Sequence, residues 1–243
     1  MTRIAVLGTE IDSTTLNEAV EKALTVMPER NGSYVITPNT EYLLRAVNEC
    51  DLRTIAQQAF LSLPDGVGVL AAARIQSKPL FRRVPGIEFA SVLLRKMGEQ
   101  ERSVFLLGGR PGVAETAGNL LKNHFPGLVV KGAYDGFFDA EEETEICRRI
   151  KEASPDLLIV CLGSPRQERW MYKHGAALHV GLMAGLGGTL DVFAGRVKRA
   201  PAPWRKAGFE WLYRTIREPK RIKRTFRLPL ILLVSLWYRV RGK

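Results

Sequence analysis

The sequence predicts an α/β fold, in which a parallel β-sheet has helices on both faces and is followed by a basic helical appendage at the C-terminus. Short β-branched apolar runs alternate with amphipathic stretches through most of the chain, as in parallel α/β sheets. The apolar runs are continuous, as expected for strands covered on both faces. Charge is divided unevenly: residues 196–243 hold fifteen Lys or Arg and two acids, whereas residues 1–195 hold 21 basic and 23 acidic side chains.

The individual elements follow from these patterns. Apolar runs bounded by glycine, proline or polar residues predict strands at residues 3–7, 33–36, 59–63, 103–107, 129–131, 157–162 and 179–183. Amphipathic periodicity between the runs predicts helices at residues 16–27, 40–48, 87–97, 113–124 and 141–152. The alternation predicts a Rossmann-like α/β domain over residues 1–195. The proline-containing segment 199–203 is expected to be a hinge to the appendage, residues 196–243.

The appendage combines positive charge with apolar side chains. Its Lys and Arg residues are interleaved with aromatic and aliphatic ones up to Phe226, and the nearly uncharged run 228–238 follows. This composition fits the headgroup zone of an anionic membrane. The run has eleven residues, whereas about 20 are needed to span a bilayer. We therefore expect a peripheral, membrane-binding appendage of two or three helices, interrupted at Pro219 and Pro229.

Three further expectations concern location and partners. The N-terminal residues do not resemble a signal peptide, and three widely spaced cysteines suggest no disulfide framework, so we expect a cytoplasmic protein on the inner face of the plasma membrane. A basic segment with Trp and Tyr would also suit nucleic acid, but the uncharged run 228–238 favours lipid, so no nucleic-acid partner is expected. Exposed apolar surface in the appendage could also produce a homo-oligomer in solution.

Polar and glycine-rich segments follow five of the expected strands. They are residues 37–39, 64–66, 108–112, 163–168 and 185–188. Because ligands of parallel sheets bind outside the carboxyl ends of the strands, these loops are expected to form one site.

The first candidates are polar side chains in the earlier loops. Asp65, in the turn Leu-Pro-Asp-Gly, could act as a general base toward a hydroxyl, or it could cap a helix at 67–73. Thr37 and Asn39 could bind a ligand or cap the next helix. Arg83 could clamp a phosphate or a sugar acid, or it could be a solvated loop charge.

The later loops supply further candidates. Gly108 and Gly109 lie in a turn between a strand and a helix, where backbone amides could approach a diphosphate, although the turn could also be only a tight connection. Gln167 follows Ser164 in the Ser-x-x-Gln pattern of a capping box, and it could instead enter the site. Asp191 could accept a hydrogen bond from a base or a ribose hydroxyl, or it could be a surface acid.

No metal ion or other cofactor is expected. The chain has no Asp-x-Asp motif, and its three histidines do not cluster in sequence with cysteines or carboxylates. The sequence also suggests no Cys/His catalytic pair.

Seven segments together resemble the WecG/TagA/CpsF family of bacterial glycosyltransferases, over nearly the whole chain. They are ITPNTEYL at 36–43, LPDGVGV at 63–69, RVPGIEF at 83–89, LLGGRPGVAE at 106–115, PDLLIVCLGSPRQERW at 155–170, GLGGTLDVFAGRVKRAP at 185–201 and EWLYRTIREPKR at 210–221. Each motif is weak alone, but their joint occurrence in this order is specific. The resemblance is strongest to the members of the family that transfer N-acetylmannosamine in wall teichoic acid synthesis.

The resemblance implies an inverting, metal-independent transfer of N-acetylmannosamine from UDP-N-acetylmannosamine to undecaprenyl-diphosphate-N-acetylglucosamine. The product would be a β1,4-linked disaccharide on the lipid, with release of UDP. By the same resemblance, Asp65 is the catalytic base. The other implied catalytic residues are Thr37, Asn39, Arg83 and Gln167. The UDP-sugar is expected near Gly108, Gly109, Arg110, Gln167, Gly187 and Asp191.

The acceptor diphosphate or the lipid headgroups are expected to meet four arginines of the appendage, in a segment that closes over the site. These are Arg214, Arg217, Arg221 and Arg224. Two alternatives stay open beside this hypothesis. The donor could be UDP-N-acetylmannosaminuronic acid or UDP-glucose, with Arg110 or Arg166 available for an acidic sugar. The chain could also be a non-enzymatic nucleotide-binding scaffold.

Overall fold

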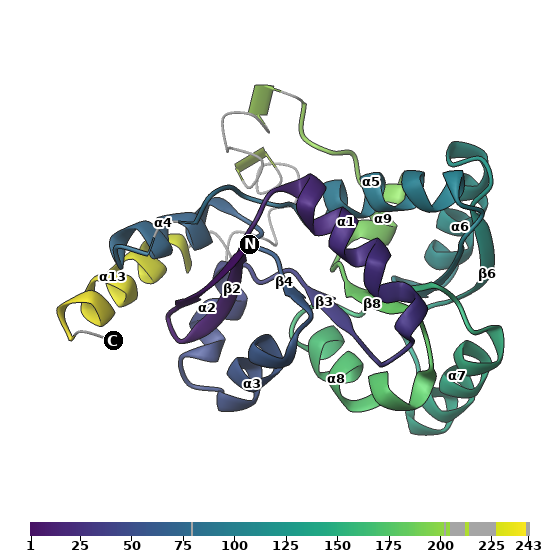
Figure 1. Ribbon diagram of the computed structural model, residues 1–243, viewed down its shortest axis with the longest axis horizontal. Coiled ribbons are helices and arrows are strands. Elements are labelled where there is room, and N and C mark those ends of the chain that lie inside the picture. The colour runs from purple at the N-terminus through teal and green to yellow at the C-terminus, as the bar shows by residue number, and fades with distance from the viewer. Residues whose placement is uncertain (79, 202, 205–211, 214–226, 242–243) are drawn as a thin grey trace.

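The centre of the structure, a computed structural model, is a parallel β-sheet (Figure 1). The structure describes residues 1–78, 80–201, 203–204, 212–213 and 227–241. Within these residues the sheet has six strands in the order β4-β3-β8-β7-β5-β6, and every neighbouring pair is parallel. The strands are β3 (Tyr34–Ile36), β4 (Leu61–Ser62), β5 (Ser103–Gly108), β6 (Val129–Tyr134), β7 (Leu157–Cys161) and β8 (Leu182–Gly185). The predicted parallel α/β sheet is therefore confirmed.

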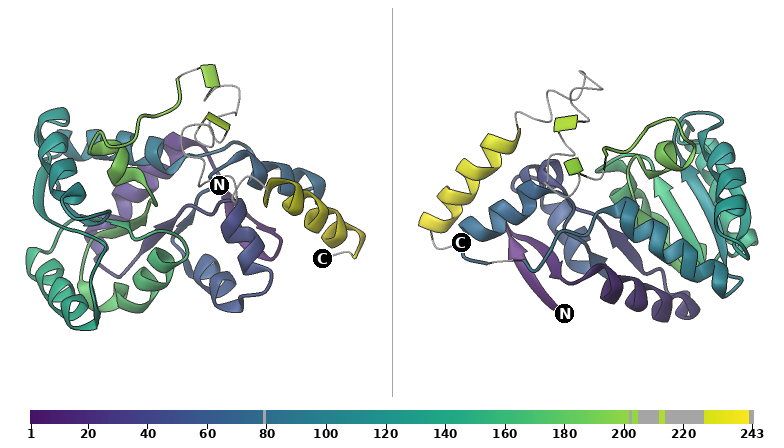
Figure 2. Two further views of the ribbon diagram at one scale, coloured as in Figure 1. Left: turned by 180° about the vertical axis from the view of Figure 1, so that it is seen from behind. Right: turned by 90° about the horizontal axis from the view of Figure 1, so that it is seen from above.

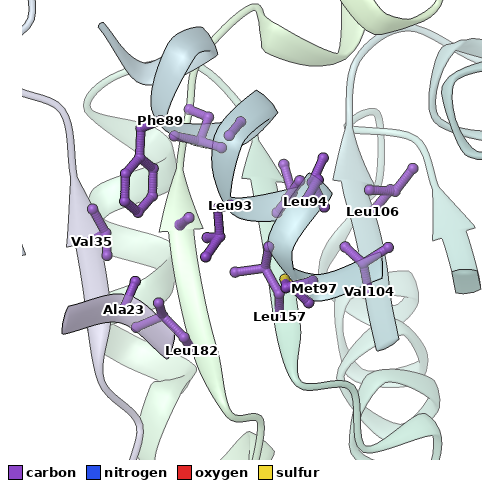
Figure 3. Packing of buried hydrophobic residues seen from close by; sticks show 14 of the residues in the cluster. Ala23, Val35, Phe89, Leu93, Leu94, Met97, Val104, Leu106, Leu157 and Leu182 are labelled. Carbon is purple, nitrogen blue, oxygen red and sulfur yellow. The ribbon is translucent and has the colours of Figure 1, made fainter. Parts of the chain in front are cut away.

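Helices cover both faces of the sheet. One face packs against α1 (Leu16–Val26), α5 (Gly86–Glu99), α6 (Val113–His124) and α9 (Thr189–Phe193). The other packs against α2 (Thr40–Ala46), α3 (Cys50–Gln58), α7 (Ala140–Ala153) and α8 (Arg166–Leu178). Figure 3 shows Phe89, Leu93 and Met97 of α5 lying over the strands that carry Val35 and Leu157. Burial on both faces explains why the strands read as continuous apolar runs.

The N-terminal segment differs from the prediction. Residues 3–7 do not join the parallel sheet: β1 (Thr2–Val6) pairs antiparallel with β2 (Thr9–Ser13) in a separate hairpin. Leu7 and Gly8 both have positive φ, 50° and 75°, which is the turn geometry that matches the twist of a two-residue hairpin. Asp12 fixes the hairpin beside β4, because its carboxylate accepts hydrogen bonds from Arg3 and from the Ser62 N–H.

One further helix and the start of one strand also differ from the prediction. Helix α3 lies in a segment where no helix was expected. The strand expected at 179–183 begins only at Leu182, because His179 ends α8 in the left-handed conformation, with φ of 51°. The short 3-10 helix η1 (Met27–Glu29) continues the chain from α1.

The last described helix, α13 (Arg227–Val240), packs along α4 (Val67–Ile75) at one end of the molecule (Figure 2). Ile231 is buried against Val69 and Ala73 of α4, and Arg239 donates a hydrogen bond to the Ile75 carbonyl. The predicted break at Pro229 is wrong, because proline is tolerated in the first turn of a helix, where it stands here. Pro219 lies outside the described residues.

Candidate active site

A cleft of about 470 Å³ opens at the carboxyl ends of the strands. The loops after β3, β4, β5, β7 and β8 all contribute to its walls, as the sequence predicted. The lining residues are Thr37, Asn39, Glu41, Asp65, Ile87, Gly109, Arg110, Gly136, Phe137, Cys161, Leu162, Gly163, Ser164, Arg166, Gln167, Leu186, Gly187, Gly188, Thr189, Asp191 and Val192.

The cleft brings together most of the residues singled out from the sequence. Eight of them line it: Thr37, Asn39, Asp65, Gly109, Arg110, Gln167, Gly187 and Asp191. Arg83 and Gly108 are not among the lining residues, although Arg83 lies in the loop before α5 and Gly108 is the last residue of β5. Arg214, Arg217, Arg221 and Arg224 lie outside the described residues.

Asp65 is held at the start of a helix that is distant in sequence. Its carboxylate accepts a hydrogen bond from the Gly86 N–H, 3.4 Å from Oδ2, in the first turn of α5. It does not cap α4, whose N-cap is Gly66 without a side-chain hydrogen bond. The Val84 N–H donates to the Pro64 carbonyl at 2.9 Å, so the loop that carries Arg83 lies beside the Asp65 turn.

Thr37 and Asn39 follow β3 and form the adjacent wall. The Thr37 hydroxyl donates to the Gly185 carbonyl at 2.9 Å, which ties the end of β3 to the end of β8. The Asn39 side chain accepts from the N–H groups of Glu41 and Tyr42, so its capping role at α2 is confirmed. Asn39 thus lines the cleft with an oxygen that is already engaged, which leaves its amide NH₂ for other partners.

The glycine loop after β5 approaches the neighbouring strand closely. Gly108 has φ of 127°, and a Cβ there would lie 2.3 Å from the Cys161 carbonyl oxygen of β7. The Gly109 N–H donates to that same oxygen at 3.2 Å, and the Gly109 carbonyl accepts from the Gly136 N–H at 2.9 Å. The loop forms part of the cleft wall, with Arg110 exposed beside Gly109.

Gln167 does not form the capping box that its sequence pattern suggested. The N-cap of α8 is Pro165, without a side-chain hydrogen bond. Instead, Gln167 Oε1 accepts from the Gly187 N–H at 3.0 Å, and Gln167 Nε2 donates to Glu168 Oε1 at 3.0 Å. The side chain of Gln167 therefore joins the loops after β7 and β8.

The cleft lining includes three further residues, Phe137, Arg166 and Cys161, and of these only Arg166 was named from the sequence as a candidate contact, for an acidic donor sugar. Phe137 lines the cleft with 68% of its surface exposed, which is unusual for a large aromatic side chain. Arg166 donates to the Gly136 carbonyl at 2.9 Å and lies over the Phe138 ring, 4.8 Å from its centroid. Burial raises the pKa of the Cys161 thiol to about 12, so this cysteine stays protonated.

The structure brings together one cysteine–histidine pair that the sequence did not suggest. Cys147 Sγ lies 3.7 Å from His174 Nδ1, and His174 Nε2 lies 2.8 Å from Glu143 Oε1. His174 is 27 positions from Cys147 and 31 from Glu143, so sequence spacing did not indicate the cluster. Burial, together with the nearby Glu143 charge, raises the pKa of Cys147 to about 11, so the pair does not supply a thiolate nucleophile. Among the described residues, no group of three or more His, Cys, Asp or Glu could hold a metal ion.

The family assignment rests on the match of the whole sequence to a family model. The model of the glycosyl transferase WecG/TagA/CpsF family matches residues 4–243. The chain belongs to this family. It is therefore a glycosyltransferase, and the cleft with its five loops is the candidate site for the transfer.

Individual relatives are named more specifically. The chain is 34% identical over 232 residues to the N-acetylglucosaminyldiphosphoundecaprenol N-acetyl-beta-D-mannosaminyltransferase of Staphylococcus aureus strain MW2, a match that covers 95% of this chain and 91% of the relative. Proteins of the same name from strains NCTC 8325 and MRSA252 match with the same identity and coverage. These relatives are named for a lipid-linked diphosphate acceptor and a hexosamine that they transfer to it.

Proposed function

We propose that this chain transfers N-acetylmannosamine from UDP-N-acetylmannosamine to undecaprenyl-diphosphate-N-acetylglucosamine, with inversion and a β1,4 linkage. The observation that carries the proposal is that Asp65 lines the same cleft as Gly109 and Arg110 of the glycine loop. A base for a sugar hydroxyl and a lining for a diphosphate thus share one cavity. The names of the relatives support this choice of donor sugar and acceptor.

In the proposed reaction the acceptor hydroxyl attacks the anomeric carbon of the donor sugar. As this oxygen–carbon bond forms, the bond from the anomeric carbon to the diphosphate oxygen breaks, and the hydroxyl proton passes to the Asp65 carboxylate. General-base catalysis of this kind contributes about 10²- to 10⁴-fold. Attack on the face opposite the leaving group gives the inverted product.

The departing UDP gains negative charge, which the cleft must offset. Arg110 is exposed on the cleft wall, and the N-terminus of α6, where Gly112 offers no side-chain cap, lies behind the same loop. We assign Gln167 and Arg83 a share in this stabilisation, and we propose that no metal ion takes part. The exposed face of Phe137 is suited to stack against the nucleobase.

A membrane-facing helix beside the cleft fits the proposed lipid-linked acceptor. The outer face of α13 consists of the exposed apolar side chains of Leu230, Leu232, Leu233, Leu236, Trp237 and Val240, which we call the α13 apolar face. Arg227, at the start of α13, forms an ion pair with the cleft-lining Glu41. The helix therefore begins at the cleft wall. Within the described part of the chain, no helix has the length and apolarity to cross a bilayer.

We propose that the α13 apolar face enters the surface of an anionic membrane, at the cytoplasmic side where UDP-sugars are found. The charge of residues 196–243, fifteen basic against two acidic, supports an anionic rather than a neutral surface. Such docking would bring the cleft to the depth at which the acceptor diphosphate lies.

The transfer is tested by measuring UDP release. The protein is incubated with UDP-N-acetylmannosamine and a short-chain analogue of undecaprenyl-diphosphate-N-acetylglucosamine, with EDTA present. Release that requires both substrates supports the donor, the acceptor and metal independence together. UDP-N-acetylmannosaminuronic acid and UDP-glucose run in parallel as alternative donors. No release from any donor would contradict the proposed transfer.

A further inference from the structure

Glu168 is a buried carboxyl group that reaches the cleft only through its neighbour. Its relative exposure is 1%, and it is not one of the residues that line the cleft. One oxygen, Oε1, accepts from Gln167 Nε2 at 3.0 Å. The side chain of Ser164 is close enough to act on the carboxyl, but the other oxygen, Oε2, makes no well-formed hydrogen bond within the part of the chain that the structure describes. Burying a carboxyl with an unpaired oxygen is unfavourable, so this position needs an explanation beyond packing.

The hydrogen bond from Gln167 fixes the orientation of a side-chain amide. Gln167 Oε1 accepts from the Gly187 N–H at 3.0 Å, while Nε2 faces the Glu168 oxygen. A reversed amide would set its NH₂ against the Gly187 N–H and its carbonyl against the Glu168 carboxyl oxygen. The contact with Gly187 would then be repulsive in every case, and the contact with Glu168 would be repulsive whenever the facing oxygen carries no proton, so Gly187 and the Glu168 acceptor oxygen select the observed orientation.

This orientation has two consequences in the cleft. Gly187 has a positive φ of 58° and lines the cleft, so its hydrogen bond to Gln167 fixes a backbone segment that glycine would otherwise leave free. An amide NH₂ also carries two hydrogens, and only one is used by Glu168. Since Gln167 itself lines the cleft, the second hydrogen is available to an acceptor oxygen bound there.

We propose that Glu168 is a positioning residue for the glycosyl transfer. It holds the Gln167 amide so that the Gly187 segment is fixed and the second Nε2 hydrogen is presented to an anionic oxygen of a bound nucleoside diphosphate. The statement that the second Nε2 hydrogen faces a bound diphosphate rests on the proposed function. The role of the hydrogen-bonded chain from Glu168 through Gln167 to Gly187 does not depend on it.

Two variants separate this role from simple packing. Glu168→Leu keeps much of the side-chain volume but removes the acceptor, whereas Glu168→Gln keeps an acceptor oxygen for Gln167. The first measurement, amide hydrogen exchange of Gly187 in the free protein, requires no substrate. We expect exchange at Gly187 to be about tenfold faster in Glu168→Leu and close to the unmodified protein in Glu168→Gln.

Kinetics supply the second measurement. Glu168→Leu should lower kcat/KM for UDP release about tenfold, and Glu168→Gln should restore most of that loss. In a Gln167→Ala background, Glu168→Leu should cause no further loss, because the amide that it orients is gone. A purely structural residue would instead give losses that add.

The results that would overturn the positioning role of Glu168 differ from the results that would contradict the proposed transfer. Unchanged Gly187 exchange in a folded Glu168→Leu protein, or additive kinetic losses, would overturn the positioning role. If Glu168→Leu does not fold, fast Gly187 exchange in Glu168→Gln would overturn it as well. If no donor is turned over at all, the transfer proposal fails, and the exchange experiment still decides whether Glu168 holds Gln167 and Gly187.

Discussion

The Asp65 carboxylate lies at the N-terminus of α5, where its Oδ2 atom is 3.4 Å from the Gly86 N–H that donates to it. The N-terminus of a helix favours negative charge, because its first N–H groups have no partners within the helix. The hydrogen bond therefore orients one oxygen of the Asp65 carboxylate toward the N-terminus of α5. The position connects three loops, since the Asp65 N–H donates to the Pro38 carbonyl and the Val84 N–H to the Pro64 carbonyl.

The first prediction concerns the base itself. Asp65→Asn preserves the shape of the side chain but removes its ability to take a proton. We expect kcat to fall about 10²- to 10⁴-fold while the affinity for UDP, measured by calorimetry, stays near that of the unmodified protein. An Asn variant that keeps substantial turnover would show that Asp65 is not the base. Loss of UDP affinity together with turnover would point to a folding defect instead.

The second prediction concerns the glycine loop. Gly108→Ala would place a Cβ 2.3 Å from the Cys161 carbonyl oxygen, in a backbone conformation with φ of 127°. Both strain and overlap should lower the free energy of unfolding by more than about 2 kcal/mol, measured by urea denaturation. Gly188→Ala is the matched control, because φ is −84° and the nearest atom to a Cβ there is 3.8 Å away. Equal effects of the two substitutions would contradict this explanation.

The order of strands and loops along the chain could be predicted from the sequence, because buried strands and the loops that follow them differ in residue type. Buried parallel strands must be continuously apolar, and polar or glycine residues follow directly where they end. The loops of Asp65, Gly109 and Gln167 were therefore assigned to one edge of the sheet, and the cleft contains all three. The N-terminal hairpin could not be predicted in this way, because a run such as residues 3–7 is equally apolar in a hairpin and in a parallel sheet.

The partners of individual side chains were less predictable, because they depend on contacts between distant loops. Local spacing suggested Asp65 as a cap of α4 and Gln167 as part of a capping box, whereas their partners are Gly86 and Gly187. The pairing of Cys147 with His174 likewise depends on how α7 packs on α8. Phe137 could have been noticed as an aromatic residue directly after the Gly136 turn, but only the structure shows its exposure.

The third prediction is a pH dependence of stability due to Glu168. Burial raises the pKa of this carboxyl above its ordinary value, so the folded state binds the proton more tightly than the unfolded chain. The protonated Glu168 carboxyl contributes its full stabilisation at a pH below the pKa that the group has in the unfolded chain. This stabilisation is lost as the pH rises through the higher pKa that the group has in the folded protein. Glu168→Gln stays neutral. The stability difference, variant minus unmodified protein, should therefore increase with pH in urea titrations between about pH 4 and pH 8.

A matched control with the opposite sign is available on α7. Hydrogen bonds from Arg148 and Arg149 lower the pKa of Glu145 from 4.5 to about 2, so the stability lost in Glu145→Gln should grow as the pH rises from about 2 to about 5 and should stay nearly constant above that. Charged Arg169 lies near Glu168 and partly opposes its shift, and Tyr42, whose pKa is raised by burial, titrates far above the window. A pH-independent difference for Glu168→Gln would show that the carboxyl is ionised throughout.

The fourth prediction concerns the α13 apolar face. Leu233 and Leu236 are both exposed, so the double substitution Leu233→Glu and Leu236→Glu should leave folding intact. If these side chains enter the bilayer, losing about 1.5 kcal/mol for each should weaken binding to phosphatidylglycerol vesicles about a hundredfold in cosedimentation. Leu120→Glu is the matched control, because Leu120 is an exposed leucine on α6, away from α13.

The dependence of vesicle binding on salt and on lipid type shows whether the protein requires an anionic membrane surface. Binding of the unmodified protein should weaken with added salt and should be much lower on phosphatidylcholine, because the basic residues of the appendage would lose their anionic partners. Single-stranded DNA serves as a competitor that carries phosphate without an apolar phase. Two results would exclude α13 as the membrane contact: vesicle binding that the double substitution leaves unchanged, and full displacement of the protein from vesicles by DNA. A selective loss of binding to anionic vesicles in the double variant would support it.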